Sequence, residues 1–155
     1  MGILERYEEI MALDFSPSIE TLSQITDEVN YYISLGQQIR QHQKDYAQAH
    51  RELNVVLERE LDCKRILDAA TDEANKYNAM ISKAKNTSGM SPSKSVLCQK
   101  QKSAAVQKAA RADYDAAVAD TKKMHELCDK LSANIYDLKV LRNYIRDKSF
   151  GGVIH

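Results

Sequence analysis

Mostly apolar side chains recur at alternating three- and four-residue spacing from Leu22 to Leu57, and no proline occurs between Leu22 and Ile81. This spacing places one side chain per turn on the same face of a helix, and its sustained use is typical of a coiled coil. Glycine and proline, which interrupt helices, number only 5 and 2 among 155 residues. The pattern therefore predicts a long amphipathic helix and an all-α fold.

The expected seam of this helix mixes large apolar residues with small or polar ones. A four-residue step from Leu57 to Leu61 follows another four-residue step, so we expect a shift of the heptad register there. Polar residues within a seam can set register and oligomer state. The expected seam residues are Leu22, Ile25, Val29, Tyr32, Gly36, Ile39, Gln43, Tyr46, His50, Leu53 and Leu57, then Leu67, Ala70, Ala74, Tyr77 and Ile81.

Two Ser-Pro pairs mark the expected starts of two long helices. Ser16 is a good N-cap and Pro17 suits the first helical position, and Ser91-Pro92 repeats this signal after Gly89. Two long helices joined by a short loop form an antiparallel hairpin. We expect a single domain over 1–155, with a short helix at about 3–13, a long helix at about 17–85, a tip loop at about 86–93 and a long helix at about 92–148.

The stripe expected on the second long helix mixes large apolar residues with small ones such as Ala110 and Ala117. A two-helix hairpin buries only one stripe per helix, so we expect the chain to self-associate into a homo-oligomer. The two phenylalanines, Phe15 and Phe150, fall together at the open end of such a hairpin, where we expect them to pack with the first helix. The expected stripe is Val106, Ala110, Tyr114, Ala117, Met124, Cys128, Leu131, Ile135, Leu138 and Ile145.

Charge is distributed unevenly along the chain, although the formal net charge is zero. No Asp or Glu occurs between Glu73 and Asp113, and this stretch brackets the expected tip, with Tyr77 near its start and Tyr114 just after its end. Lysine and arginine without competing carboxylates suit the phosphates of single-stranded nucleic acid. The alternative partner is an acidic protein surface, such as the N-terminal segment of a neighbouring subunit. The candidate binding residues are Lys76, Lys83, Lys85, Lys94, Lys100, Lys102, Lys108 and Arg111.

Patterns typical of enzymes and metal sites are missing from the sequence. A nucleophilic thiol needs an adjacent base and a lowered pKa, and the sequence around Cys63 and Cys98 supplies neither. His125 and Cys128 stand three apart, and His50 is expected to lie across the hairpin from them, which resembles a zinc site without its fourth ligand. We therefore expect no enzymatic activity, no cofactor and no metal.

The spacing of the cysteines and the hydropathy of the chain indicate in which cellular compartment the protein is expected. Three cysteines that are far apart in the sequence favour a reducing environment. No apolar run approaches the roughly 18 residues that span a bilayer, and the N-terminus lacks the pattern of a signal peptide. The sequence predicts a cytoplasmic protein, in the host cytoplasm if a phage encodes it, with no membrane partner.

The order of elements along the chain matches a known layout. The matching segments are Leu4-Glu5, Glu8-Glu9-Ile10, Asp14-Phe15-Ser16-Pro17 leading to Leu22, Tyr31-Tyr32, the polar break at 86–93 and Ile145-Arg146-Asp147-Lys148-Ser149-Phe150. In this layout the chain resembles the UvsY family of phage recombination mediators. Members of that family are small helical, ring-forming proteins that bind single-stranded DNA and help to load a recombinase in place of a single-strand-binding protein.

The resemblance implies a homo-oligomer whose partners are single-stranded DNA and a recombinase. The long seam and the zero net charge also suit a second function. That alternative is a protein-only coiled-coil scaffold, adaptor or inhibitor, for example a phage assembly or host-takeover factor.

Overall fold

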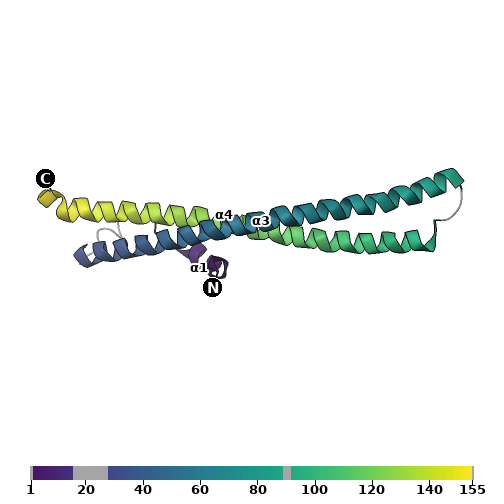
Figure 1. Ribbon diagram of the computed structural model, residues 1–155. Coiled ribbons are helices and arrows are strands. Elements are labelled where there is room, and N and C mark those ends of the chain that lie inside the picture. The colour runs from purple at the N-terminus through teal and green to yellow at the C-terminus, as the bar shows by residue number, and fades with distance from the viewer. Residues whose placement is uncertain (1, 16–27, 89–91, 155) are drawn as a thin grey trace. The chain divides into compact units, whose positions relative to one another are not determined.

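The computed structural model describes residues 2–15, 28–88 and 92–154, and it describes the side chains of all of these except 28, 88 and 149–154 (Figure 1). A 3-10 helix, η1 (Ile3–Arg6), leads directly into α1 (Tyr7–Ala12). The two long helices are α3 (Glu28–Ser88) and α4 (Lys94–Ile154), each of 61 residues. No strand occurs within these described ranges, so the predicted all-α class is confirmed.

Several helix ends differ from the expected ones. α3 continues through Thr87 to Ser88, and the Thr87 hydroxyl donates a hydrogen bond to the carbonyl of Lys83 in the preceding turn. α4 begins at Lys94, with Ser93 as its N-cap: the Ser93 hydroxyl oxygen accepts a hydrogen bond of 3.3 Å from the backbone N–H of Val96. Ser91, the expected N-cap, lies outside the described residues.

The C-terminal end of α4 also differs from the expected one. α4 runs through Gly151-Gly152 to Ile154 instead of stopping near residue 148. A helical pair of glycines is weakly unfavourable but does not by itself end a helix. The expected start at Ser16-Pro17 lies outside the described residues.

The chain divides into two compact units, and the two long helices pass through both. Unit 1 comprises Met1–Asn54 with Lys122–His155, and unit 2 is Val55–Thr121. Within each unit, segments of α3 and α4 pack side by side in opposite directions, as the hairpin prediction requires (Figure 1). Unit 1 also contains η1 and α1.

The core of unit 1 is made of large apolar side chains. One cluster joins the start of α3 to the end of α4, and Phe15 packs against it together with Tyr31 and Tyr32. The side chain of Phe150, which we expected beside Phe15, lies outside the described part. The buried residues of the cluster are Leu35, Ile39, Leu138, Leu141 and Ile145.

The N-terminal segment, η1 with α1, packs on both long helices of unit 1. Ile3 and Ile10 are 2% and 0% exposed. On the α4 side, the hydroxyl of Tyr7 donates a hydrogen bond to the Glu126 carboxylate, which together with burial raises the pKa of Tyr7. The Lys123 ammonium lies 5.7 Å from the centre of the Tyr7 ring, within range of a cation–π contact.

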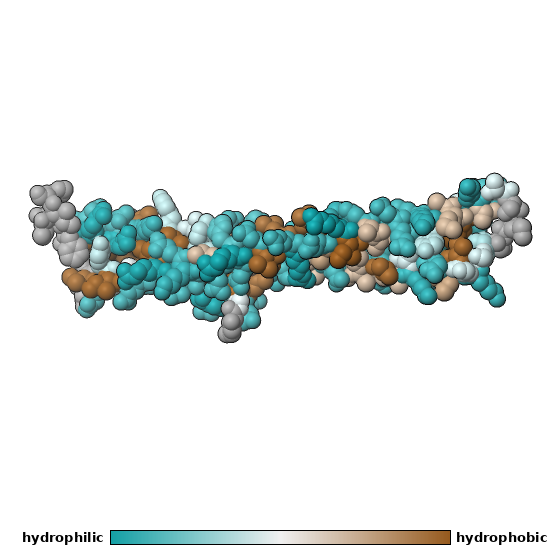
Figure 2. Space-filling view, viewed as in Figure 1, coloured by the Kyte–Doolittle hydropathy of each residue, from teal (hydrophilic) through white to brown (hydrophobic). Residues whose placement is uncertain are grey.

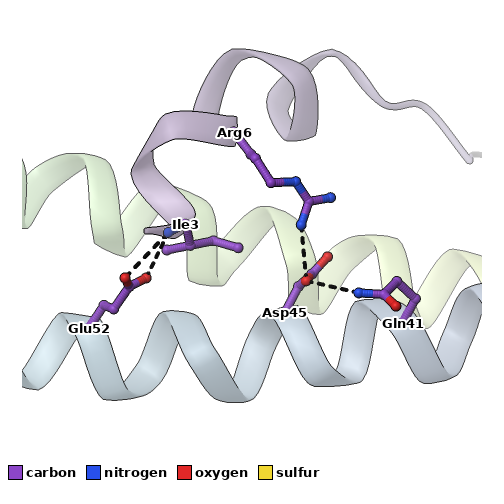
Figure 3. A network of polar contacts seen from close by, with 5 residues as sticks. All are labelled: Ile3, Arg6, Gln41, Asp45 and Glu52. Atoms are coloured by element: carbon purple, nitrogen blue, oxygen red, sulfur yellow. Dashed lines mark hydrogen bonds and ion pairs between the residues drawn. The ribbon is translucent and has the colours of Figure 1, made fainter. Parts of the chain in front are cut away.

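Polar contacts fix the same segment to α3 (Figure 3). The backbone N–H of Ile3 donates to the Glu52 carboxylate at 3.0 Å. The Arg6 guanidinium lies 3.1 Å from Asp45, whose carboxylate also accepts a hydrogen bond from Gln41. These contacts satisfy a helix N-terminus and a buried carboxylate at once.

The buried side chains of unit 2 are mostly small. Leu67 and Ile81 are its only large buried side chains among those described. Small residues let two helices approach closely, but they bury little apolar area. The remaining buried residues are Ala70, Ala74, Ser103, Ala110, Ala117 and Thr121.

α3 keeps a single heptad phase through its described side chains, so the register shift expected after Leu57 is wrong. Leu57 and Leu61 are 39% and 52% exposed, whereas Val56 and Glu60 are half-buried in the seam. Gln43 and His50 are likewise exposed beside buried neighbours. The buried or half-buried seam residues are Leu35, Ile39, His42, Tyr46, Ala49, Leu53, Val56, Glu60, Cys63, Leu67, Ala70, Ala74, Tyr77, Ile81 and Ala84.

The stripe of α4 is close to the expected one. Val106 is an exception, because it is 57% exposed while Ser103 and Gln107 occupy the seam beside it. Every other residue expected on this stripe is buried or half-buried.

Candidate nucleic-acid interface

The eight basic residues predicted to bind nucleic acid all lie in unit 2, and all are exposed. Three of them lie on the last turns of α3 and five lie on the first half of α4. Within the described part of the chain, none of the eight forms an ion pair with a carboxylate. Within the described residues, none of these charges is therefore in direct contact with a carboxylate.

Contacts within unit 2 set the register between the two basic segments. Gln107 Nε2 donates to Thr71 Oγ1 at 3.2 Å, and further from the tip Arg59 Nη1 lies 2.9 Å from Asp120 Oδ2. Counting in opposite directions from Thr71 and Gln107 brings Lys76 level with Lys102. The hairpin thus gathers both basic segments at one end of the unit, as the sequence predicted.

Two sides of unit 2 can be distinguished by what flanks the seam. On one side a groove of about 160 Å³ lies between the helices, with Glu73 and Tyr77 from α3 facing Gln99, Lys102 and Val106 from α4. We call this side the groove face. It carries the residues that directly flank one edge of the seam in the heptad register.

The opposite side is the Tyr114 face. Tyr114 is half-buried there beside Leu57 and Leu61, and the Lys64 ammonium lies 5.5 Å from the centre of its ring. The cation lies within the distance at which it is attracted to the face of an aromatic ring.

The basic residues divide between these faces. Their heptad positions assign Lys76, Lys83 and Lys102 to the groove face. The same register assigns four others to the Tyr114 face and leaves Lys100 at the exposed end of the seam. The residues on the Tyr114 face are Lys85, Lys94, Lys108 and Arg111.

The net charges of the two faces differ. On the Tyr114 face those four residues and Lys64 stand against Asp68 and Asp115, so five basic residues less two acidic ones give +3. On the groove face the three lysines and Arg59 balance four carboxylates, which gives zero. The acidic residues of the groove face are Asp62, Glu73, Asp113 and Asp120. The Tyr114 face is therefore the one suited to a polyanion.

The histidine and cysteine positions that resembled a zinc site are not arranged as one. His50 is exposed, with its ring centre 4.6 Å from that of Tyr46, and His125 is exposed as well. Cys128 is buried, and burial raises the pKa of its thiol. No group of three or more His, Cys, Asp or Glu side chains that could hold a metal ion occurs among the described residues.

Two buried polar atoms of unit 1 were not foreseen. His42 Nδ1 and Asn134 Nδ2 have no hydrogen-bond partner among the described residues, although the side chains are 8% and 1% exposed. The His42 ring packs edge-to-face against Phe15, with the ring centres 5.3 Å apart. Burial of a neutral imidazole in this position lowers the pKa of His42.

Comparison with protein-family models, with curated proteins and with solved structures found no match. Among the described residues, no helix combines the length and the apolar character required to cross a membrane.

Proposed function

We propose that this protein is a non-enzymatic homo-oligomer that binds single-stranded nucleic acid through the basic end of unit 2, in the manner of a recombination mediator. The observation that carries the proposal is the set of eight exposed basic side chains without ion-pair partners, in a stretch free of carboxylates. Such side chains release condensed counterions when they contact phosphates, which favours binding to any sequence.

The Tyr114 face is the better contact surface for the strand. Its net charge of +3 attracts phosphates, and Lys108 and Arg111 lie one helical turn apart, so both can follow a phosphate backbone. The half-exposed ring of Tyr114 lies one turn further along α4 and offers a surface for base stacking. The proposed cellular setting is the cytoplasm, with a recombinase as the protein partner.

Fluorescence anisotropy of a labelled oligothymidylate at several salt concentrations tests this proposal. The variant Lys85→Gln/Lys108→Gln/Arg111→Gln removes three charges from the Tyr114 face. We expect it to bind at least about tenfold more weakly at low salt. We expect the slope of log affinity against log salt to decrease in magnitude by about 2, at roughly 0.7 per lost phosphate contact on a single strand.

The matched control is Arg51→Gln/Lys122→Gln/Lys139→Gln, which removes three exposed charges from unit 1. If both triple variants lose the same affinity, binding reflects overall charge and the assignment to unit 2 is wrong.

A protein-only scaffold or adaptor is the second candidate function, because unit 2 also exposes apolar side chains that a partner helix could cover. Absence of oligonucleotide binding by the unsubstituted protein at low salt, together with a discrete oligomer in light scattering, would favour this function over the first.

A further inference from the structure

The groove-face positions of the heptad are covered in unit 1 and open in unit 2. In unit 1 these positions on α4 are Leu127, Asn134 and Leu141, with exposed fractions of 0%, 1% and 5%, and those on α3 include Asp45 and Glu52, which hold the N-terminal segment. Among the described residues, no segment covers the equivalent positions of unit 2 in this way. There Ile66, Met80 and Val106 are 60%, 44% and 57% exposed.

These exposed apolar side chains belong to a unit with little core of its own. Its fully buried side chains are mostly alanine, serine and threonine, and only Leu67 and Ile81 are large and buried among its described residues. A pair of helices with such a core gains stability when further apolar area is removed from water. Hydrophobic side chains appear at the surface among mostly hydrophilic ones in Figure 2.

Charge on the groove face is segregated along the helices. Lys76, Lys83 and Lys102 lie toward the tip together with Glu73, and three basic residues less one acidic residue give +2. Toward the other end lie Arg59 and the three aspartates Asp62, Asp113 and Asp120, which give −2. Ile66 and Val106 lie between the two ends. A surface with this order of charges is complementary to itself when a second copy lies across it in the opposite direction.

We propose that the groove face of unit 2 binds the groove face of a second copy, with the two copies antiparallel and related by a two-fold axis. The basic end of each copy then lies on the acidic end of the other, and Ile66, Met80 and Val106 are buried between them. Such a contact is isologous and closes after two copies. The inference rests on the homo-oligomer of the proposed function and names its surface.

The charge of the Tyr114 face argues against a dimer in which two Tyr114 faces contact each other. Its charge is +3 in both copies, so two copies placed face to face would repel each other unless an anion lay between them. The groove face therefore suits a second copy, while the Tyr114 face remains available to a polyanion.

Light scattering of the full chain at about 50 μM, without nucleic acid, tests the contact. We expect a mass of two chains for the unsubstituted protein and of one chain for Ile66→Gln/Val106→Gln. The matched control Leu61→Gln/Val118→Gln changes two exposed residues outside the groove face, which are 52% and 37% exposed, and should keep the mass of two chains. A monomeric unsubstituted protein, or equal masses for the two variants, overturns the proposal.

Charge exchange tests the direction of the copies. Lys76→Glu/Lys102→Glu changes the net charge of the groove face from zero to −4 and should give monomers. Adding Asp62→Lys/Asp113→Lys exchanges the two ends and should restore the mass of two chains. Because the restored variant contains the first two substitutions, its recovery also excludes misfolding, whereas a failure of the exchange to restore the mass contradicts the antiparallel contact.

Oligonucleotide anisotropy on the same variants separates this inference from the proposed function. Ile66→Gln/Val106→Gln should lose the second copy and still bind oligothymidylate, since its Tyr114 face is unchanged. Conversely, Lys85→Gln/Lys108→Gln/Arg111→Gln should lose oligonucleotide affinity and keep the mass of two chains. A dimer that binds no nucleic acid would leave the groove-face contact standing and remove the proposed function.

Discussion

Arg6 of η1 and Asp45 of α3 form an ion pair in which the guanidinium Nη1 lies 3.1 Å from the carboxylate Oδ1. The Asp45 side chain is 6% exposed and that of Arg6 40% exposed, so the carboxylate depends on its partners more than the guanidinium does. Gln41 donates a second hydrogen bond to the same oxygen, at 3.2 Å. The N-terminal segment therefore supplies part of what makes a buried charge in α3 tolerable.

Replacing Arg6 alone should destabilise unit 1 more than replacing Arg6 and Asp45 together. We expect Arg6→Met to lower the free energy of unfolding by roughly 1–3 kcal/mol, because it leaves a buried carboxylate without its cation. Arg6→Met/Asp45→Asn should recover part of that loss, since the neutral amide still accepts from Gln41. Urea unfolding followed by circular dichroism measures both. The idea fails if the double variant is the least stable of the set.

The heptad phase of α3 can be checked with two leucines in the same helix of unit 2. Leu67 is 2% exposed and Leu61 is 52% exposed. We expect Leu67→Ala to lower the thermal midpoint strongly, as the loss of roughly 2–5 kcal/mol at a buried leucine requires. Leu61→Ala should change stability by no more than about 1 kcal/mol. Equal effects would restore the register shift that the sequence suggested.

Stability should fall on mild acidification because of His42. Burial holds its pKa below the value of about 6.5 for a free histidine, the nearby Asp45 opposes this, and Arg6 adds to it. As the pH falls the unfolded chain therefore takes up the proton first. The full stability is present above about pH 6.5 and decreases as the pH drops through that value toward the lower folded pKa.

His42→Leu removes the titrating group from the seam of unit 1. We expect its free energy of unfolding to depend less on pH between about 7 and 5 than that of the unsubstituted protein. His125→Gln, at an exposed histidine of the same unit, is the control and should leave the dependence unchanged. Identical pH profiles for His42→Leu and the unsubstituted protein would contradict the assignment.

The three thiols should react with N-ethylmaleimide in the order of their exposure. Cys98 is exposed, Cys63 is half-buried and Cys128 is buried. Burial, with a smaller contribution from Asp129, raises the pKa of Cys128 and so reduces its thiolate fraction. We expect Cys98 to be modified at least about tenfold faster than Cys128. Peptide mass spectrometry over time gives both rates, and comparable rates would show that unit 1 opens readily.

Periodicity was sufficient to predict the class of the fold and the position of the hairpin tip. Helix formers fill the segments on both sides of Gly89, and the residues around Gly89 are the one cluster of turn formers between them. The sequence therefore allows a single chain reversal between two long helices. The phase of the seam was harder to predict around Leu57 and Leu61. Hydrophobicity favours these leucines, but the residues that lie half-buried in the seam are Val56 and Glu60, each one position earlier.

How much of the candidate site could be predicted also depends on the heptad phase of the two long helices. A stretch without carboxylates is visible in the sequence, and so the exposure of all eight basic residues could be expected. Their division between two faces could not, since assigning Lys102 to one side and Arg111 to the other requires knowing that Ser103 and Gln107, and not Val106, lie in the seam. The cover of η1 over Asp45 was likewise beyond prediction, because it depends on contacts 39 residues apart in the sequence.

The unbroken heptad phase limits how the length of unit 2 can change. Each inserted or deleted residue rotates everything beyond it by about 100° around the helix axis, which would exchange seam and surface. Seven residues gained or lost by α3, matched by seven in α4, return every side chain to its own face. Insertions and deletions in this hairpin should therefore be tolerated as paired heptads, and a shortened form can keep both the Tyr114 face and the groove face in place.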